Sequence, residues 1–296
     1  MLRLVVVGLD GSQESLTAAE WAAREAARRG LPLRLIHACA GLDPDPPELS
    51  GPAAERCRVR PVLRDAADRL TARYPRVPLS VEQVSEPAAE ALVSAAAEAE
   101  LLVLGSRAFT GLGGLIAGSV AMAAVAHAPR PVALVRADHV VENEYLPDAA
   151  GRPSAETACR AVVLGLDPAH PSGELISFAF ESAALRAAPL RVVYAWQLPF
   201  VQHAAQTRAR RAMGAAAQRT LAAKLAPWRE KFPGVEIDES AQEGSAAARL
   251  THAAQDAGLL VVGRRIRPSR IGTHIGPVVH AAIHQVRCPV VIVPHE

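Results

Sequence analysis

Val5-Val6-Val7-Gly8-Leu9-Asp10 forms the first apolar run of the chain, and it returns as Val162-Val163-Leu164-Gly165-Leu166-Asp167. Leu101-Leu102-Val103-Leu104-Gly105 returns in the same way as Leu259-Leu260-Val261-Val262-Gly263. The offset between the copies is 157 residues at the Asp pair and 158 at the Gly pair. It is again 158 at Pro131 and Pro289, a register that chance matches would not keep. The sequence is therefore a tandem duplication, and either copy could have kept or lost the original chemistry.

The repeated stretches are short apolar runs closed by Gly or Asp, which is typical of buried parallel strands that end in turns. In the first copy the pattern predicts strands at residues 4–7, 33–38, 81–84, 101–104 and 132–135. Helices are predicted at 12–29, 53–74, 87–97 and from 119 onward. Ser12 should cap the first of these helices and Gly30 should end it. Pro61 should break or kink the second helix. In the second copy the pattern predicts strands at 161–165, 191–194, 235–238, 259–262 and 290–293. It also predicts a long helix at 202–231, and the basic stretch 201–211 around its start should face solvent.

Alternating strands and helices of this length predict an α/β fold of two tandem, doubly wound domains, each with a five-stranded parallel sheet. The polar, Pro- and Gly-containing stretch between the copies is typical of a linker. We expect a first domain at residues 1–138, a linker at 139–157 and a second domain at 158–296. Ligands of such sheets bind at the carboxyl ends of the strands.

Composition excludes several classes of partner. The formal net charge is only +2, which gives no reason to expect binding to nucleic acid or to an anionic membrane. The four cysteines are scattered without metal-like spacing, which favours a reducing, cytoplasmic setting over a disulfide framework or a zinc site. No apolar segment is long enough to cross a bilayer.

The candidate site combines the ends of the first and fourth strands. Asp10 follows the first strand, where a ribose or an adenine could meet it, and Gly11 permits close approach of the backbone. After the fourth strand comes a glycine-rich loop and then the start of a helix, whose free N–H groups can cradle a phosphate without any catalytic side chain. The residues of this second segment are Gly105, Arg107, Ala108, Gly118, Ser119 and Val120.

These motifs resemble the universal stress proteins in their tandem two-domain form, over nearly the whole of both repeats. The resemblance rests on VVVGLDGS, on LLVLGSR followed by a glycine loop and GSV, and on the closing PVALVR strand. It implies a Rossmann-like fold related to the adenine nucleotide alpha hydrolases, and ATP as the ligand, with Mg²⁺ as a candidate companion ion. Asp10, Gly11, Ser12 and the backbone near Ala38 would contact adenosine, and the glycine loop would contact phosphate. Ala108 stands where the ATP-binding members have glycine, which would weaken the site by about 1 kcal/mol if that position needs a positive φ.

The second copy departs further from the pattern. Its corresponding candidate residues are Asp167, Ala195, Gly263, Arg265, Gly276 and Val278. Ile266 replaces the intermediate glycine, and Pro277, which has no N–H to offer a phosphate, replaces the serine. Several arginines in the same loop could hold phosphate by charge instead. We expect a degenerate or altered second site.

The leading hypothesis is a nucleotide-binding stress regulator whose shape or partners change when ATP binds. It would hydrolyse ATP slowly at most, and we assign it no catalytic residue. Two alternatives stay open: a protein-interaction module that binds no nucleotide, and an ATP-using or dinucleotide enzyme of the same fold, although its usual motifs are missing. His280 and His284 have metal-like helical spacing but no evident third ligand, so we expect no metal site.

The family resemblance also implies an assembly. The final strands, 132–135 and 290–293, would pair as an intramolecular pseudo-dimer, which would cover two open strand edges. A further homodimer and an unidentified regulatory protein are the remaining candidate partners.

Overall fold

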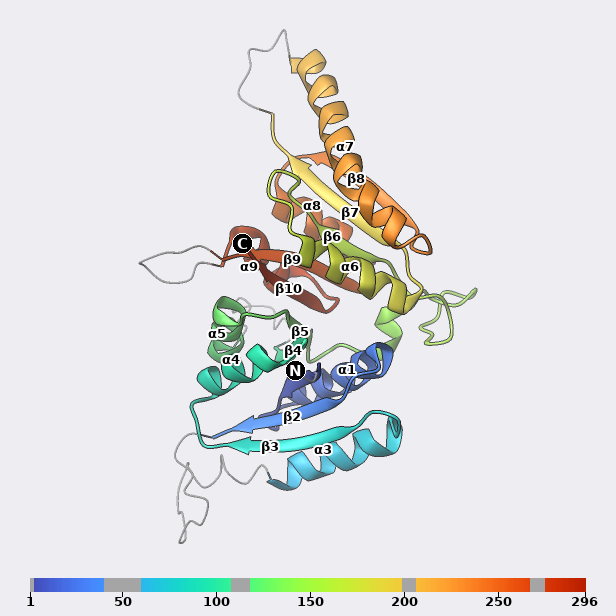
Figure 1. Cartoon of the computed structure of the whole chain (residues 1–296). Helices are drawn as coiled ribbons and strands as arrows, with labels where there is room; N and C mark the ends of the chain where they lie inside the picture. The colour runs from blue at the N-terminus through green and yellow to red at the C-terminus, as the bar shows by residue number, and fades with distance from the viewer. Residues whose placement is uncertain (1–2, 40–59, 108–117, 199–205, 267–274) are drawn as a thin grey trace, which may run out of the picture. The chain divides into compact units, whose positions relative to one another are not determined.

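The computed structural model describes residues 3–39, 60–107, 118–198, 206–266 and 275–296. These residues divide into two compact units, with the division along the chain between Val140 and Val141. The predicted α/β fold is confirmed, with a parallel sheet in each unit (Figure 1).

The described part of the first unit has the strand order β3-β2-β1-β4-β5, and all of its neighbouring strands are parallel. Helices α1 and α3 contact each other on one side of this sheet, and α4 and α5 contact each other on the other side, as right-handed crossovers require. The strands are β1 Val5–Gly8, β2 Leu33–Ala38, β3 Leu79–Val84, β4 Leu101–Ser106 and β5 Val132–Arg136. The helices are α1 Gln13–Arg29, α3 Arg60–Arg73, α4 Ala88–Glu98 and α5 Ser119–His127.

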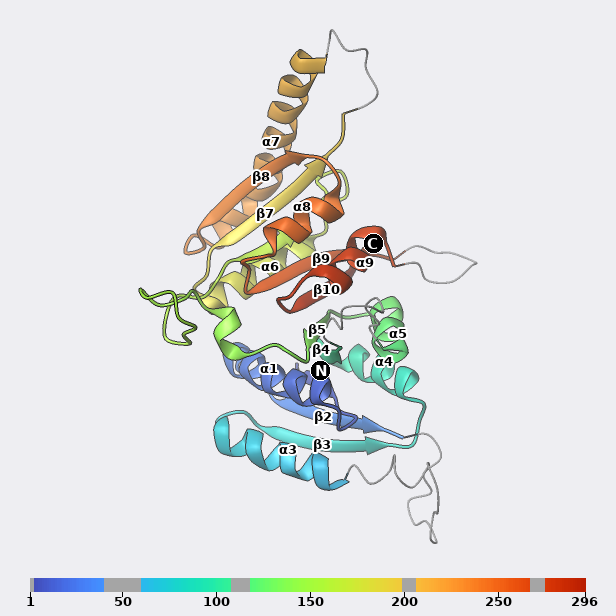
Figure 2. The ribbon, with the colours of Figure 1, turned by 180° about the vertical axis from the view of Figure 1, so that it is seen from behind.

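The second unit repeats this topology with the order β10-β9-β6-β7-β8, which can be followed from behind in Figure 2. Its strands are β6 Val162–Gly165, β7 Leu190–Trp196, β8 Ile237–Glu243, β9 Leu259–Arg265 and β10 Val290–His295. Its helices are α6 Gly173–Arg186, α7 Gln206–Lys231, α8 Ala246–Ala253 and α9 Pro277–Gln285.

The predicted ends of α1 are confirmed. The Ser12 hydroxyl accepts a hydrogen bond from the Ser15 N–H at 3.2 Å, and Gly30 ends the helix in the left-handed conformation with φ of 64°. The second copy ends its matching helix at Ala187, with φ of 46°, so a non-glycine residue has taken over the same cap. The duplication therefore preserved the backbone path more strictly than the residue type.

Pro61 is the second residue of the described part of helix α3, which runs from Arg60. The helix then continues to Arg73 without a break. The earlier part of the predicted helix, 53–59, lies outside the described residues.

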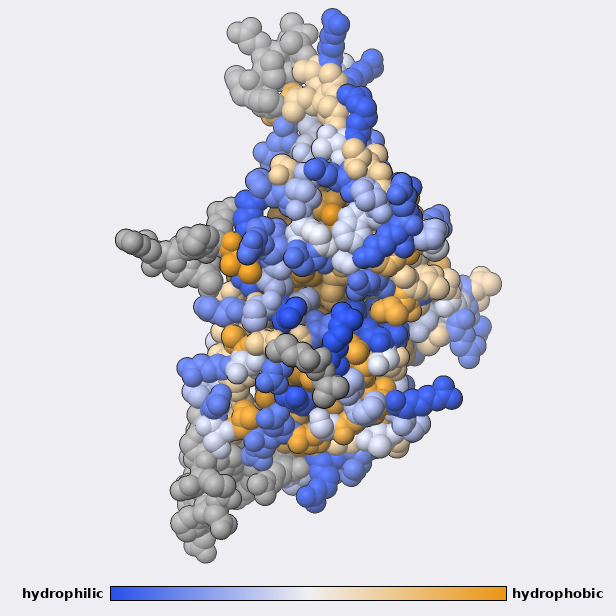
Figure 3. Space-filling view, in the orientation of Figure 1, coloured by the Kyte–Doolittle hydropathy of each residue, from blue (hydrophilic) through white to orange (hydrophobic). Residues whose placement is uncertain are grey.

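The long helix α7 is held to its unit by aromatic packing. Trp228 and Phe232 both lie against Phe180 of α6, with ring centroids 5.9 and 5.3 Å away. Arg208, Arg210 and Arg211 at the start of the helix are exposed, which confirms the predicted solvated face. Figure 3 shows hydrophilic side chains gathered along this end of α7.

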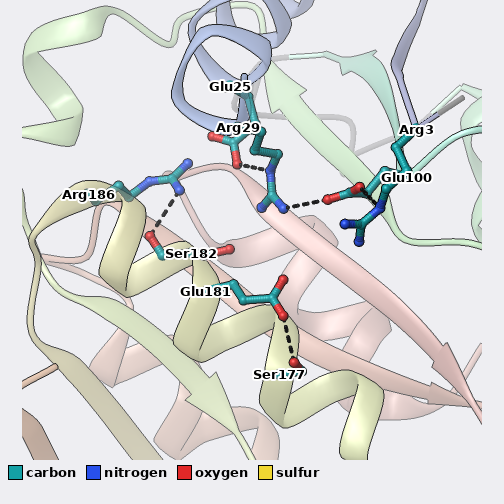
Figure 4. Close-up of polar contacts among 8 residues, drawn as sticks. All are labelled: Arg3, Glu25, Arg29, Glu100, Ser177, Glu181, Ser182 and Arg186. Atoms are coloured by element: carbon teal, nitrogen blue, oxygen red, sulfur yellow. Dashed lines mark hydrogen bonds and ion pairs between the residues drawn. The ribbon is translucent and has the colours of Figure 1, made fainter. Parts of the chain in front are cut away.

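An ion-pair network joins the end of α1 to the start of β4. The Arg29 guanidinium lies between the carboxylates of Glu25 and Glu100, at 2.8 and 3.3 Å, and Arg3 pairs with Glu100 at 2.7 Å (Figure 4). The Arg29 and Glu25 side chains are almost completely buried. Figure 4 also draws two contacts within α6, one of which joins Ser177 to Glu181. Buried charges of this kind hold the helix in one position on the sheet.

The polar stretch between the copies is an ordered turn. The Asp148 carboxylate accepts hydrogen bonds from the N–H groups of Ala150 and Arg152, each at 2.9 Å, and pairs with the Arg152 side chain. An antiparallel bridge joins Tyr145 to Cys159. The sequence indicated a linker here, but not its internal order.

We expect Asp148→Asn to loosen this turn. The hydrogen bonds from the Arg152 backbone and side chain hold the pKa of the Asp148 carboxyl below its usual value. A lowered folded pKa contributes stability above the unfolded pKa, and that stability is lost as pH falls through the folded value. The protection factors of the Ala150 and Arg152 amides, which are NMR exchange rates corrected for their intrinsic pH dependence, should therefore fall in the variant and in the wild type on acidification. Glu156→Gln is the matched control, and an equal fall in both variants would contradict the role of Asp148.

No helix in the described part of the chain is long and apolar enough to cross a membrane.

Candidate functional site

The candidate site lies at the carboxyl ends of β1 and β4, where the strand order of the first unit reverses. Connections leave these two neighbouring strands in opposite directions, which opens a crevice between them. A cavity of about 310 Å³ occupies this position. Its size is at the lower end of the range usual for small-molecule pockets.

The structure brings together most of the first-copy candidates around this cavity. The lining includes Asp10, Ser12, Ala38, Gly105, Arg107, Gly118, Ser119 and Val120. Gly11 is not among the lining residues, but it makes the turn after β1 with φ of 85°. Ala108 lies outside the described residues.

Asp10 is held as an ionised acceptor at the mouth of the cavity. Its carboxylate accepts hydrogen bonds from the Ser12 N–H at 3.0 Å and from the Ser12 hydroxyl at 2.6 Å. Partial burial raises the pKa of Asp10, but these hydrogen bonds outweigh burial, so the net pKa lies below the usual value. The carboxylate is therefore charged at neutral pH and can accept a hydrogen bond from a ligand hydroxyl or amine.

The start of α5 supplies the donors of the site. Gly118 is the N-cap and has no side chain with which to cap the helix, and the first backbone bond of the helix runs from the Met122 N–H to the Gly118 carbonyl. The N–H groups of Ser119, Val120 and Ala121 precede that bond and have no partner within the helix. A Cβ added to Gly118 would meet no atom within 4 Å, so the space beside these N–H groups is open.

Apolar residues form walls of the cavity, and a buried histidine supports the segment before Asp10. Ile36, Leu92 and Leu104 line the cavity walls. His37 is 5% exposed, and its Nδ1 lies 2.7 Å from the Leu9 carbonyl oxygen. This bond fixes the segment that leads into Asp10. An apolar slot beside an ionised carboxylate and a row of N–H donors suits a flat heterocycle that carries a phosphate.

Several lining residues were not among the candidates from the sequence, including Glu14, Ser15, Ala88 and Leu92. Ser15 donates its hydroxyl to the Ser12 carbonyl at 2.9 Å, and Glu14 lies 3.6 Å from Arg107 between the carboxylate Oε1 and the guanidinium Nε. Position in the first turns of α1 and α4 was the available signal, because helix starts face the same crevice as the strand ends.

We expect Ser12→Ala to weaken both the helix cap and the ionisation of Asp10. Loss of the cap should cost about 1 kcal/mol of stability. Loss of the hydroxyl hydrogen bond should raise the pKa of Asp10 toward its ordinary value, because one donor to the charged form is removed. An NMR titration of the Asp10 side-chain carbon measures this shift. An unchanged Asp10 pKa would show that the Ser12 backbone N–H alone holds the carboxylate.

The second unit holds the corresponding residues in a different chemical setting. The Asp167 carboxylate accepts from the Ala169 N–H at 3.0 Å, and its other oxygen lies 3.0 Å from His170 Nδ1. Gly276 is the N-cap of α9, and Pro277 takes the first helical position. The remaining candidates lie on β7 (Ala195), β9 (Gly263 and Arg265) and the first turn of α9 (Val278).

His280 and His284 lie one turn apart on α9, with ring centroids 4.2 Å from each other. Partial burial and the neighbouring His280 lower the pKa of His284. Across the described ranges, no group of three or more His, Cys, Asp or Glu side chains is placed to hold a metal ion.

Comparison with known proteins agrees with this architecture. A model of the Universal stress protein family matches the chain twice, over residues 1–136 and 159–294. A universal stress protein of Mycobacterium tuberculosis is 31% identical over 302 residues, which cover 97% of this chain and 96% of that protein. A solved universal stress protein from Archaeoglobus fulgidus shares the fold over 99% of this chain and 98% of its own, with a TM-score of 0.65 and 14% identity.

A universal stress protein solved in complex with cAMP matches a smaller part, 46% of this chain and 98% of its own, at 26% identity and a TM-score of 0.36. Both copies of the duplication fall within the family model, and the mycobacterial relative spans them together. The chain therefore belongs to the universal stress protein family, in its tandem two-domain form.

Proposed function

We propose that this protein is a nucleotide-binding regulator of the stress response that binds ATP chiefly in its first unit. The observation that carries the proposal is the cavity that joins the ionised Asp10 carboxylate to the uncapped start of α5. Asp10 and the backbone near Ala38 would receive the adenosine, and the N–H groups at Gly118 to Val120 would receive the phosphates.

The lining favours binding over chemistry. The described lining residues include neither a lysine nor a histidine, and the low pKa of Asp10 makes its carboxylate a poor proton acceptor. Any hydrolysis of ATP should therefore be slow, and the ligand would act by its presence, through a change in shape or in partners.

The second unit would contribute less to binding. Pro277 has no N–H, so the start of α9 lacks the donor that Ser119 offers at the matching position of α5. In addition, His170 already engages the Asp167 carboxylate. A degenerate site in this copy fits a role in assembly or in contact with a regulatory protein. We place the protein in the cytoplasm, where the thiols of Cys39, Cys159 and Cys288, which form no disulfide in the described part of the chain, would stay reduced.

The direct test is to denature freshly purified full-length protein and identify the released small molecules by chromatography and mass spectrometry. We expect an adenine nucleotide at about one equivalent per chain or, if the site empties during purification, saturable binding of ATP in calorimetric titration. Absence of both would overturn the proposal and leave the protein-interaction module as the better hypothesis.

A further inference from the structure

The phosphate end of the first site is poor in positive charge. Between Gly105 and Gly118 the sequence reads SRAFTGLGGLIA, so Arg107 is the single charged residue of the whole loop. The corresponding segment of the second copy carries Arg264, Arg265, Arg267 and Arg270. Among the described residues that line the cavity, Arg107 is therefore the one cationic side chain that can join the start of α5 in neutralising a phosphate.

That one guanidinium already faces a carboxylate. Arg107 Nε lies 3.6 Å from Glu14 Oε1, and both residues line the cavity together with Ser119 and Val120. The Arg107 side chain is 69% exposed, whereas that of Glu14 is 24% exposed. An ion pair this open to solvent is weak, so Arg107 can leave it at little cost.

Glu14 cannot move away as easily. It lies in the first turn of α1, one residue before Ser15, and its backbone carbonyl packs against Gly105, where an added Cβ would come within 2.6 Å of the Glu14 oxygen. The backbone that carries the Glu14 side chain is thus held in place, and Glu14 lines the same cavity as the phosphate donors Ser119 and Val120. With Asp10, the described lining carries two carboxylates against one guanidinium, a formal charge of −1.

We propose that the Glu14–Arg107 pair selects the ligand of this site by its charge, and this inference rests on the proposed function above. A nucleotide with a single phosphate can draw Arg107 off Glu14 and be neutralised by it. A free triphosphate carries about two more negative charges and brings them toward the Glu14 carboxylate. The site therefore prefers AMP-like nucleotides, or ATP with a divalent cation, to free ATP.

The test is calorimetric titration of the full-length protein with AMP and with ATP, each in EDTA and in Mg²⁺. For the wild type we expect tighter binding of AMP than of ATP in EDTA, and a gain for ATP when Mg²⁺ is added. Glu14→Gln keeps the side-chain size and removes the charge. It should strengthen binding of free ATP by roughly threefold to tenfold and change AMP binding by less than about twofold. Arg107→Gln should weaken both nucleotides.

Glu20→Gln is the matched control. Glu20 lies on the same helix, pairs with Arg73 at 3.5 Å and does not line the cavity. Its substitution by Gln removes the same charge as Glu14→Gln does. If Glu14→Gln changes AMP and ATP affinity equally, or no more than Glu20→Gln does, the charge selection is wrong while nucleotide binding stands. If the wild type binds neither nucleotide under any condition, the proposed function itself fails.

Discussion

Gly118→Glu is expected to abolish nucleotide binding by the first unit, with a loss of at least about 100-fold in affinity. A Cβ at this position meets no atom of the described residues within 4 Å, so we expect the fold to accept the substitution. The new carboxylate would lie at the start of α5, where it can take the N–H groups of Ser119 and Val120 that a phosphate needs. Titration with ATP measures the loss, and an unchanged melting temperature would show that the loss is local.

The duplication supplies the control for this experiment. Gly276 is the N-cap of α9 in the same topological position, and an added Cβ there also meets nothing within 4 Å. Because Pro277 already removes a donor from that helix start, Gly276→Glu should cost the protein much less of its nucleotide affinity. An equal loss in the two variants would show that the copies contribute equally and that the ranking of the sites is wrong.

The strands and helix ends were predictable because their signals are local. Runs such as Val5-Val6-Val7 are buried on both faces of a parallel sheet, so they read as continuous apolar segments. The edge strands β3 and β8 are instead half-buried or exposed, and Val81 of β3 is 47% exposed. Ser12 and Gly30 mark the ends of α1 by side-chain chemistry that acts within a few residues. The order of these elements was then enough to place the candidate site at the strand ends.

The remaining features of the site depend on contacts between distant segments. Leu92 reaches the cavity from α4, and Glu14 meets Arg107 across 93 positions of the sequence, so neither is marked by its neighbours in the chain. The ordered turn around Asp148 was missed for a different reason. Polar residues with Gly and Pro indicate a loop, but only the positions of the Ala150 and Arg152 N–H groups make Asp148 its centre.

The two copies also differ in how their first helix meets the sheet. In the first unit, the space above Gly105 is filled by backbone of α1, with Glu14 carbonyl carbon and Ser15 nitrogen within 2.5 and 2.7 Å of a hypothetical Cβ. In the second unit, the space above Gly263 is filled by the side chains of His295 and Leu175. The same glycine thus supports a rigid contact in one copy and an adjustable one in the other.

Gly105→Ala should therefore destabilise the first unit, whereas Gly263→Ala should be tolerated by the second. The added methyl group in Gly105→Ala meets backbone that cannot rotate away, so α1 must shift, at a cost of about 1–3 kcal/mol. For a unit of this size we expect the melting temperature to fall by roughly 2–4 °C for each kcal/mol. In Gly263→Ala the nearest atoms belong to the side chains of His295 and Leu175, which can turn aside.

Scanning calorimetry measures both variants, and amide exchange in α1 and in α6 assigns each change to its unit. Because Ser12, Glu14 and Ser15 all move with the start of α1, Gly105→Ala should also weaken nucleotide binding in the first unit, which Gly263→Ala should leave unaltered. The result that contradicts this account is a loss of stability in Gly263→Ala as large as that in Gly105→Ala. In that case His295 would be as firmly held as the backbone of α1, and the second copy would have replaced one rigid contact with another.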